Sequence, residues 1–141
     1  MGGDGGCAVI IDGLLRALGD HDHIRTMYLV GDEDAIRPAL GQAEHLAARI
    51  EVVHSPEVLS MEEKPVEGLR RKKNCSIAMA MDLVKQGQAD AILSAGNTGG
   101  LVAAASIKLR TLPGVDRPGI ATVMPTKTGN FVLLDAGANV E

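Results

Sequence analysis

The chain has 141 residues, of which 45% are hydrophobic, and this predicts one globular domain with a sizeable core. Its net charge of −4 argues against a nucleic-acid-binding surface, because such surfaces are basic. Only Tyr28 and Phe131 are aromatic, which also argues against a platform for base stacking.

The first residues predict a glycine-rich loop and a helix. Residues 1–6 are typical of a loop between a strand and a helix, although no strand precedes them. A helix is expected over residues 8–18, with an apolar face made by Val9, Leu14, Leu15 and Leu18. Asp20–His23 then alternates carboxylate and imidazole, as some metal sites do. Its place between a helix and a strand favours a solvated turn, so we predict no metal there.

Two strands and a short helix are predicted next. The apolar run at residues 24–30 predicts a buried strand, and residues 33–40 predict a short helix limited by Pro38. Residues 45–49 are expected to complete a helix before a second strand at residues 50–54. His54 ends that strand, where we expect backbone groups to satisfy its ring.

A basic segment follows a loop at residues 55–65. Five positive side chains fall within ten positions: Lys64, Arg70, Arg71, Lys72 and Lys73. Such a cluster suits a phosphate or an acidic partner. The alternative is an exposed helical face on which Glu67 and Arg71 pair, and charge alone favours this alternative.

An amphipathic helix is predicted over residues 76–86, ending at Gly87. Its apolar residues recur at spacings of three and four: Ile77, Ala80, Met81 and Val84. A short apolar run at residues 90–93 is then expected to form a strand, and residues 102–110 are expected to form another helix.

The stretch Ser94–Leu101, between that strand and that helix, is the main candidate for a binding site. Its glycines permit unusual backbone conformations and the close approach of a ligand, while Asn97 and Thr98 suit a helix cap. Free N–H groups at the start of a helix favour a phosphate or an oxyanion. An ordinary strand-to-helix turn explains the same residues, and this stretch by itself does not separate the two interpretations.

The last part of the chain predicts a hairpin. Residues 119–124 and 131–134 are expected to be strands, and the short turn between them favours antiparallel pairing. The alternation of strands and helices before them predicts a mostly parallel sheet with helices on both faces and chemistry at the carboxyl ends of its strands. A hairpin places Lys127 and Asp135 at opposite edges, and we expect Asp135 to face the turn at Asn97.

Several motifs together resemble the PlsX-type phosphate acyltransferases. They run in order over the chain: Met1–Asp4, Pro65–Ser76, Ala89–Gly99, Arg117–Pro118 and Leu133–Asn139. The chain departs from the family pattern because the strand before Met1 and the C-terminal half are missing. Cys75 also stands where the family commonly has serine, and Gly100 replaces a usual alanine. The resemblance therefore implies that residues 1–141 are the N-terminal portion of a single α/β domain, a Rossmann-like three-layer sandwich with a mostly parallel sheet that is incomplete at both ends.

The resemblance implies transfer of a fatty acyl group from acyl carrier protein to inorganic phosphate, forming acyl phosphate for phospholipid synthesis. Phosphate is itself the acceptor, so transfer is expected to be direct, without an acyl-enzyme on Cys7 or Cys75. The residues expected to act in catalysis are Asn97, Thr98, Lys73 and Asp135. The residues expected to bind substrate are Asp4, Lys72, Gly96, Gly99 and Asn139. No cofactor or metal is implied.

Partners and location are predicted on the same basis. The expected partners are acyl carrier protein and inorganic phosphate, in a homodimer that associates peripherally with the membrane and the downstream glycerol-3-phosphate acyltransferase, and not with nucleic acid. Two cysteines and the lack of a segment of membrane-spanning length favour the cytoplasm. Two alternatives stay open: a phosphotransacetylase-like transferase that uses acyl-CoA, and a non-catalytic piece that binds a nucleotide or, through residues 70–73, an acidic carrier protein.

Overall fold

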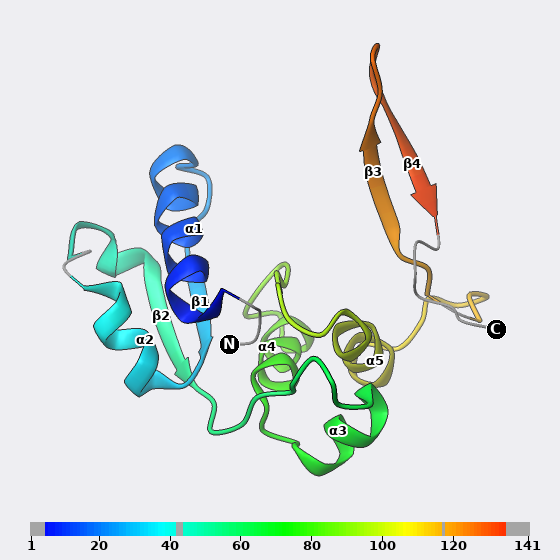
Figure 1. The fold of residues 1–141 in the computed structure, drawn as a ribbon, viewed down its shortest axis with the longest axis horizontal. Coiled ribbons are helices and arrows are strands. Elements are labelled where there is room, and N and C mark those ends of the chain that lie inside the picture. The colour runs from blue at the N-terminus through cyan, green and yellow to red at the C-terminus, as the bar shows by residue number, and fades with distance from the viewer. Residues whose placement is uncertain (1–4, 42–43, 117, 135–141) are drawn as a thin grey trace. The chain divides into compact units, whose positions relative to one another are not determined.

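A computed structural model describes residues 5–41, 44–116 and 118–134 (Figure 1). The chain divides into two units, Met1–Leu109 and Arg110–Glu141. The predicted site residues Asp4, Asp135 and Asn139 lie outside the described residues.

The first unit begins with two helices around a strand. Helix α1 (Gly6–Asp20) buries Ile11, Leu14 and Leu18, whereas Val9, expected on its apolar face, is 62% exposed. The exposed turn predicted at Asp20–His23 is confirmed as the link to strand β1 (Met27–Gly31). Helix α2 spans Glu33–Leu40, as predicted. It begins at Asp32, whose carboxylate accepts the N–H of Asp34 at 3.1 Å.

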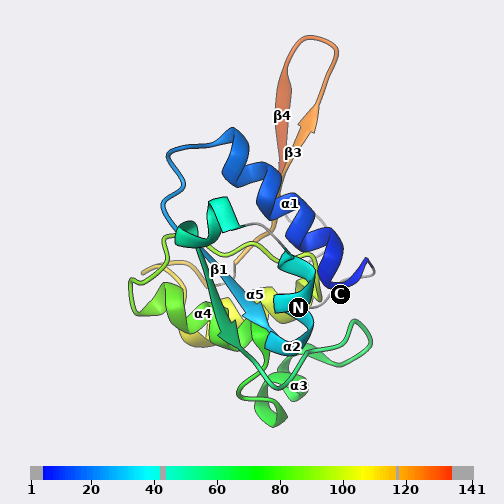
Figure 2. The same ribbon diagram turned by 90° about the vertical axis from the view of Figure 1, so that its left-hand side faces the viewer.

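A parallel strand pair is the centre of this unit. A 3₁₀ helix, η1 (Glu44–Arg49), leads into strand β2 (Ile50–His54), which pairs with β1 in a register from Met27–Ile50 to Gly31–His54. Leu29 faces α1 and α2, and Val30 points to the opposite face because side chains alternate along a strand. Helix α4 lies against β1 on that opposite face (Figure 2).

The second core of the unit joins three helices, α3 (Pro65–Arg71), α4 (Ser76–Lys85) and α5 (Thr98–Lys108). Leu69, Cys75, Ile77, Ala78, Met81 and Ala104 are its buried helical or cap residues. Leu59 joins them from the loop between β2 and α3, where it is only 2% exposed. Gly87, predicted to end the helix expected over residues 76–86, has a φ of 71° just after α4, which suits glycine.

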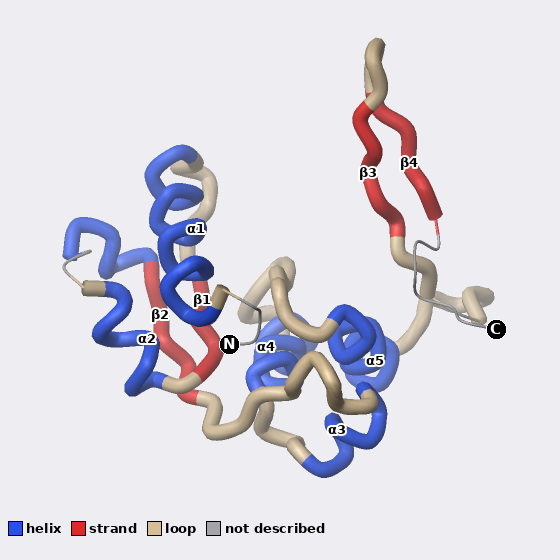
Figure 3. Tube along the Cα trace, in the orientation of Figure 1, coloured by secondary structure: helices blue, strands red, loops and turns tan. Residues whose placement is uncertain are grey.

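The strand predicted at residues 90–93 is wrong. These residues have no regular structure, and they form part of the long loop between α4 and α5 (Figure 3). A short apolar run such as Ala91–Leu93 becomes a strand only when a neighbouring strand completes its hydrogen bonds, and no described strand pairs with it. Leu93 is therefore 97% exposed.

The second unit contains the predicted antiparallel hairpin, which is confirmed. Strand β3 (Ala121–Pro125) pairs with β4 (Asn130–Leu134), with Val123 opposite Val132 and Met124 opposite Phe131. The turn is closed by the N–H of Thr126, which donates to the carbonyl of Gly129 at 2.7 Å.

The helices and strands confirm the α/β class. The described strands form two separate pairs, one parallel and one antiparallel, and so do not make up the single, mostly parallel sheet that the sequence predicted. Among the described helices, none has the length and apolar character needed to cross a membrane.

Candidate anion site at the start of helix α5

Asn97 caps helix α5, as the sequence predicted. Its backbone is extended, and its side-chain Oδ1 accepts the N–H of Gly100 at 2.8 Å. This is the usual N-cap interaction, which satisfies one of the four N–H groups that lack a partner at the start of a helix. Asn97 is 6% exposed, so its carboxamide is enclosed by protein.

The other half of the Asn97 carboxamide holds the loop before α3. Nδ2 donates to the carbonyl of Ser60 at 2.9 Å and to that of Glu63 at 3.3 Å. The side chain therefore has partners on both sides, and one residue both starts α5 and fixes a loop 37 positions earlier in the chain. This arrangement makes Asn97 a positioning residue in the described structure.

Glu63 and Lys72 fix the same loop from the side of α3. Glu63 accepts the N–H of Ser60 at 2.9 Å and the ammonium of Lys72 at 2.7 Å, and it contacts Arg71 at 3.3 Å. Lys72 also donates to the carbonyl of Val58 at 2.8 Å. The hydrogen bond from Lys72, and to a smaller extent the one from Ser60, lowers the pKa of Glu63 from its ordinary value. The carboxylate therefore stays ionised, and Lys72 is committed to the loop.

The glycines of the candidate site allow helices and loop to pack closely. Leu59 lies between α3 and α5, and a Cβ built at either Gly68 or Gly100 would come closer to its methyl groups than real atoms approach. A Cβ at Gly99 would lie 2.9 Å from Pro65 Cγ. Gly99 and Gly100 are in the first turn of the helix, so they serve close packing here rather than an unusual backbone conformation.

Two N–H groups remain at the start of α5. Among the residues that the structure describes, none accepts a hydrogen bond from the N–H of Thr98 or of Gly99, and both residues are exposed. Such groups carry the positive end of the helix dipole. The geometry provides N–H donors for an anion at Thr98 and Gly99, with the Asn97 side chain behind them.

The remaining predicted site residues fall in different places. The N–H of Gly96 donates to Ser94 Oγ at 3.2 Å, just before the cap. Lys73 is exposed, and its ammonium has no ion-pair partner among the described residues, in contrast to Lys72. Sequence reasoning missed Glu63 and Leu59, whose importance depends on contacts that local patterns do not reveal.

His54, Cys7 and Cys75 are the other residues that the sequence analysis considered for chemistry. His54 Nδ1 accepts the N–H of Glu33 at 3.3 Å, which confirms the prediction that a backbone group satisfies the ring. Cys75 is completely buried, and Cys7 donates weakly to the carbonyl of Ala35. Within residues 5–41, 44–116 and 118–134, no three His, Cys, Asp or Glu side chains gather as metal ligands do.

Comparison with known proteins covers the whole chain. The profile of a family described as "Fatty acid synthesis protein" matches residues 1–141. The chain belongs to this family. Proteins named "Phosphate acyltransferase" are similar to this chain. One from Shewanella sp. (strain ANA-3) is 49% identical over 99% of this chain, and one from Erythrobacter litoralis is 46% identical over 100% of it. These matches confirm the resemblance to phosphate acyltransferases. The chain spans 41% and 40% of the lengths of these two relatives.

Proposed function

We propose that the whole protein to which this chain belongs transfers a fatty acyl group from acyl carrier protein to inorganic phosphate, forming acyl phosphate for phospholipid synthesis. Membership of the fatty acid synthesis protein family and the printed names of the relatives support an acyltransferase that uses phosphate. The observation that carries the proposal within this chain is the start of α5, where exposed Thr98 and Gly99 have N–H groups suited to an anion.

The reaction needs phosphate to be held and aimed at the thioester carbon. A phosphate oxygen attacks this carbon, the C–O bond forms, and the C–S bond breaks, so that the carrier thiol leaves with a proton. The Thr98 and Gly99 N–H groups and the Thr98 hydroxyl hold the phosphate or the developing oxyanion. Lys73 balances the phosphate charge, because Lys72 is engaged by Glu63 and Val58.

The remaining members of the site complete this proposal. Asn97 acts by positioning the two N–H donors, Gly96 lies just before this cap, and Gly99 supplies one of the donors while allowing Pro65 to pack closely. Asp4, Asp135 and Asn139 are proposed to orient phosphate by hydrogen bonds. Transfer is direct, with phosphate itself as the acceptor. Burial makes Cys75 inaccessible as a nucleophile.

The architecture and assembly of the whole protein are part of the same proposal. Its sheet is Rossmann-like and mostly parallel. The protein is cytoplasmic and homodimeric, and it associates peripherally with the membrane on which the next acyltransferase acts. The family resemblance supports these statements.

A matched pair of cap variants tests the function. In the full-length protein, Asn97→Ala removes the cap of α5, while Asp32→Ala removes the equivalent cap of α2. We expect Asn97→Ala to lower acyl phosphate formation by roughly 100-fold, as misplacing donors by about an ångström does. Asp32→Ala should stay within about threefold, because the loss of a cap costs only ~1 kcal/mol of stability.

The choice of acyl donor is part of the same experiment. The parent protein is offered acyl carrier protein thioester and acyl-CoA in turn, with inorganic phosphate, and acyl phosphate is measured. Faster turnover of the carrier thioester is expected, whereas a preference for acyl-CoA would support the phosphotransacetylase-like alternative. Absence of acyl phosphate from either donor would overturn the proposal.

A further inference from the structure

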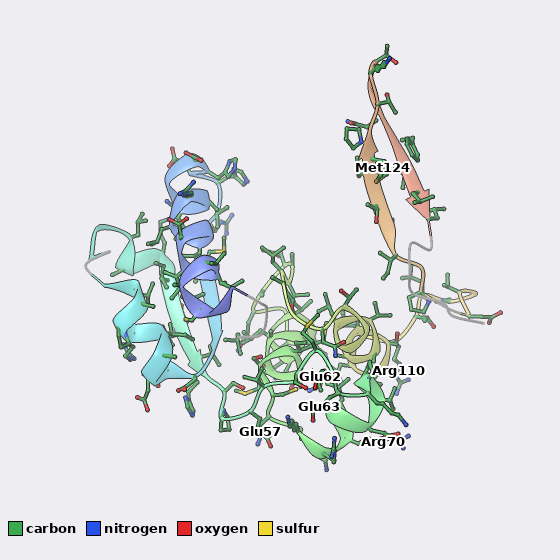
Figure 4. The ribbon with its side chains drawn as sticks, in the orientation of Figure 1. Glu57, Glu62, Glu63, Arg70, Arg110 and Met124 are labelled. Atoms are coloured by element: carbon green, nitrogen blue, oxygen red, sulfur yellow. The ribbon has the colours of Figure 1, made fainter. Side chains whose placement is uncertain are left out.

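The loop at residues 57–64, which we call the clasp loop, forms one backbone β-bridge at its start, from Glu57 to Cys75, and is otherwise held mainly by side chains. The carbonyl of Val58 accepts from Lys72, and those of Ser60 and Glu63 accept from Asn97. Within the loop, the N–H of Ser60 donates to the Glu63 carboxylate. Figure 4 labels three acidic residues on this loop, Glu57, Glu62 and Glu63, beside α3. Glu63 differs from the others because it binds both the loop and α3's C-terminal end.

Glu63 is the residue on which the clasp loop depends. Its side chain is 18% exposed, and its two oxygens accept the Ser60 N–H, the Lys72 ammonium and the Arg71 guanidinium. Charge-assisted hydrogen bonds of this kind are stronger than neutral ones. The carboxylate therefore fixes Ser60 relative to α3.

Ser60 connects this network to the start of α5. The carbonyl of Ser60 accepts Asn97 Nδ2 at 2.9 Å, and Asn97 Oδ1 accepts the Gly100 N–H at 2.8 Å. Leu59 is next to Ser60 and lies in the gap left by Gly68 and Gly100. A shift of Ser60 therefore moves or releases the cap that orients the first N–H groups of α5.

We propose that Glu63 is a positioning residue for anion binding at α5, acting through Ser60 and Asn97. This inference rests on the proposed function and deepens it, because it assigns a role to a residue that does not itself face the anion. Lys72 belongs to the same device, since its ammonium joins the Glu63 carboxylate to the Val58 carbonyl. Removing the Glu63 charge should leave the N–H groups of Thr98 and Gly99 less well ordered, although neither residue is itself changed.

The test compares Glu63→Gln with Glu67→Gln in the full-length protein. Glu67 is a matched control because, among the residues that the structure describes, its one ion-pair partner is Lys64, at 3.5 Å, and its side chain is 65% exposed. We expect Glu63→Gln to raise the KM for inorganic phosphate by roughly tenfold while kcat changes less than about threefold, within the range that misplacement produces. Glu67→Gln should change neither constant by more than about twofold, as is usual for exposed pairs.

A second measurement follows the loop directly and does not require turnover. Amide hydrogen exchange at residues 58–63 and 98–101 should become faster in Glu63→Gln, and inorganic phosphate should protect residues 98–101 less than in the parent. If the full-length protein makes no acyl phosphate, the proposed function fails, but phosphate protection still tests the role of Glu63.

Lys72→Gln provides an independent variant if Glu63→Gln does not fold. It removes the charge that Glu63 binds, so its effect on phosphate KM should resemble that of Glu63→Gln, and the double variant should be little worse than either single one. Additive effects would contradict action through a shared network. Faster exchange in the clasp loop with an unchanged phosphate KM would overturn the proposal, as would unchanged exchange.

Discussion

Leu59 occupies the space that Gly100 leaves beside helix α5. The two residues are far apart in sequence, yet a Cβ added at Gly100 would run into Leu59 Cδ2. Leu59 has no room to turn away, because its Cδ1 packs equally closely against Gly68 and its side chain is only 2% exposed. The contact brings the clasp loop, α3 and α5 into one core.

Gly100→Ala should therefore destabilise the protein, although alanine is normally the better helix former. We expect a loss of about 1–3 kcal/mol, the usual cost of overpacking a buried site. Leu59→Ala alone should cost about 2–5 kcal/mol by leaving a cavity. The double variant should be less destabilised than the sum, and urea unfolding of the four proteins measures the difference.

Gly13→Ala is the matched control for that substitution. Gly13 lies inside α1, and a Cβ there would meet nothing within 4 Å. The same change should stabilise the protein by roughly 0.5–1 kcal/mol because alanine has the higher helix propensity. Equal effects at the two glycines would contradict the packing argument at Gly100.

Local patterns predicted the elements whose signals lie within a few residues. The N-cap at Asn97, the helix at residues 33–40, the strand at residues 50–54 and the hairpin all follow from residue type and spacing. The strand at residues 90–93 did not follow, because a strand needs a partner that the run itself does not specify.

The clasp loop shows why the rest of the candidate site was not predictable. Its residues have no regular period, and the sequence alone does not reveal that Glu63 meets Lys72 or that Leu59 meets Gly100. The basic run is visible in the sequence, but its division into Lys72, which is bonded to the loop, and exposed Lys73 depends on three-dimensional contacts. Helix α1 lies where the sequence predicts a helix. Its apolar face was predicted to include Val9, which is exposed, whereas Ile11 is buried instead.

Arg49 provides a second structural prediction, at the end of α1. Its guanidinium donates to the carbonyls of Leu18, His21 and Ile24, at distances from 2.6 to 3.1 Å. Lysine carries the same charge but lacks the planar fork that reaches all three carbonyls. Arg49→Lys should therefore lower the free energy of unfolding by about 1–3 kcal/mol, as expected when charged hydrogen bonds are lost.

Arg16→Lys is the control for the Arg49 variant. Arg16 pairs with Asp12 at 3.1 Å, and both side chains are largely exposed. Chemical denaturation should show a change of less than about 0.5 kcal/mol, because exposed pairs contribute little. A similar loss in both lysine variants would mean that the three carbonyl contacts of Arg49 do not stabilise the fold.

The clasp loop should also depend on pH. The hydrogen bonds from Lys72 and Ser60 lower the pKa of Glu63 below its ordinary value of 4.5, so the folded state binds this proton less readily than the unfolded chain. Its contribution is therefore complete above pH 4.5 and is lost as the pH falls through the lower folded value. Arg71 and Lys72 face the carboxylate.

Amide exchange at residues 58–63, corrected for the intrinsic rate at each pH, measures this effect. Exchange in the parent should accelerate as the pH is lowered below 4.5, while Glu63→Gln should already exchange fast and show no such step. Glu57→Gln is the control, because the Glu57 carboxylate also accepts a backbone hydrogen bond in this loop, from the N–H of Asn74. A step that persists in Glu63→Gln would assign the pH dependence to a different group.

The two cysteines allow a test of direct acyl transfer. Burial raises the pKa of the Cys7 thiol, so little thiolate is present at neutral pH, and Cys75 is completely buried. Iodoacetamide labelling of the native full-length protein, followed by mass spectrometry, should modify Cys7 more slowly than a free thiol and leave Cys75 unmodified until urea is added. Acyl phosphate formation should persist in Cys7→Ser, because phosphate attacks the thioester without a cysteine intermediate. Fast labelling of Cys7 at neutral pH, together with loss of turnover in Cys7→Ser, would instead identify this residue as an acyl carrier in a two-step mechanism.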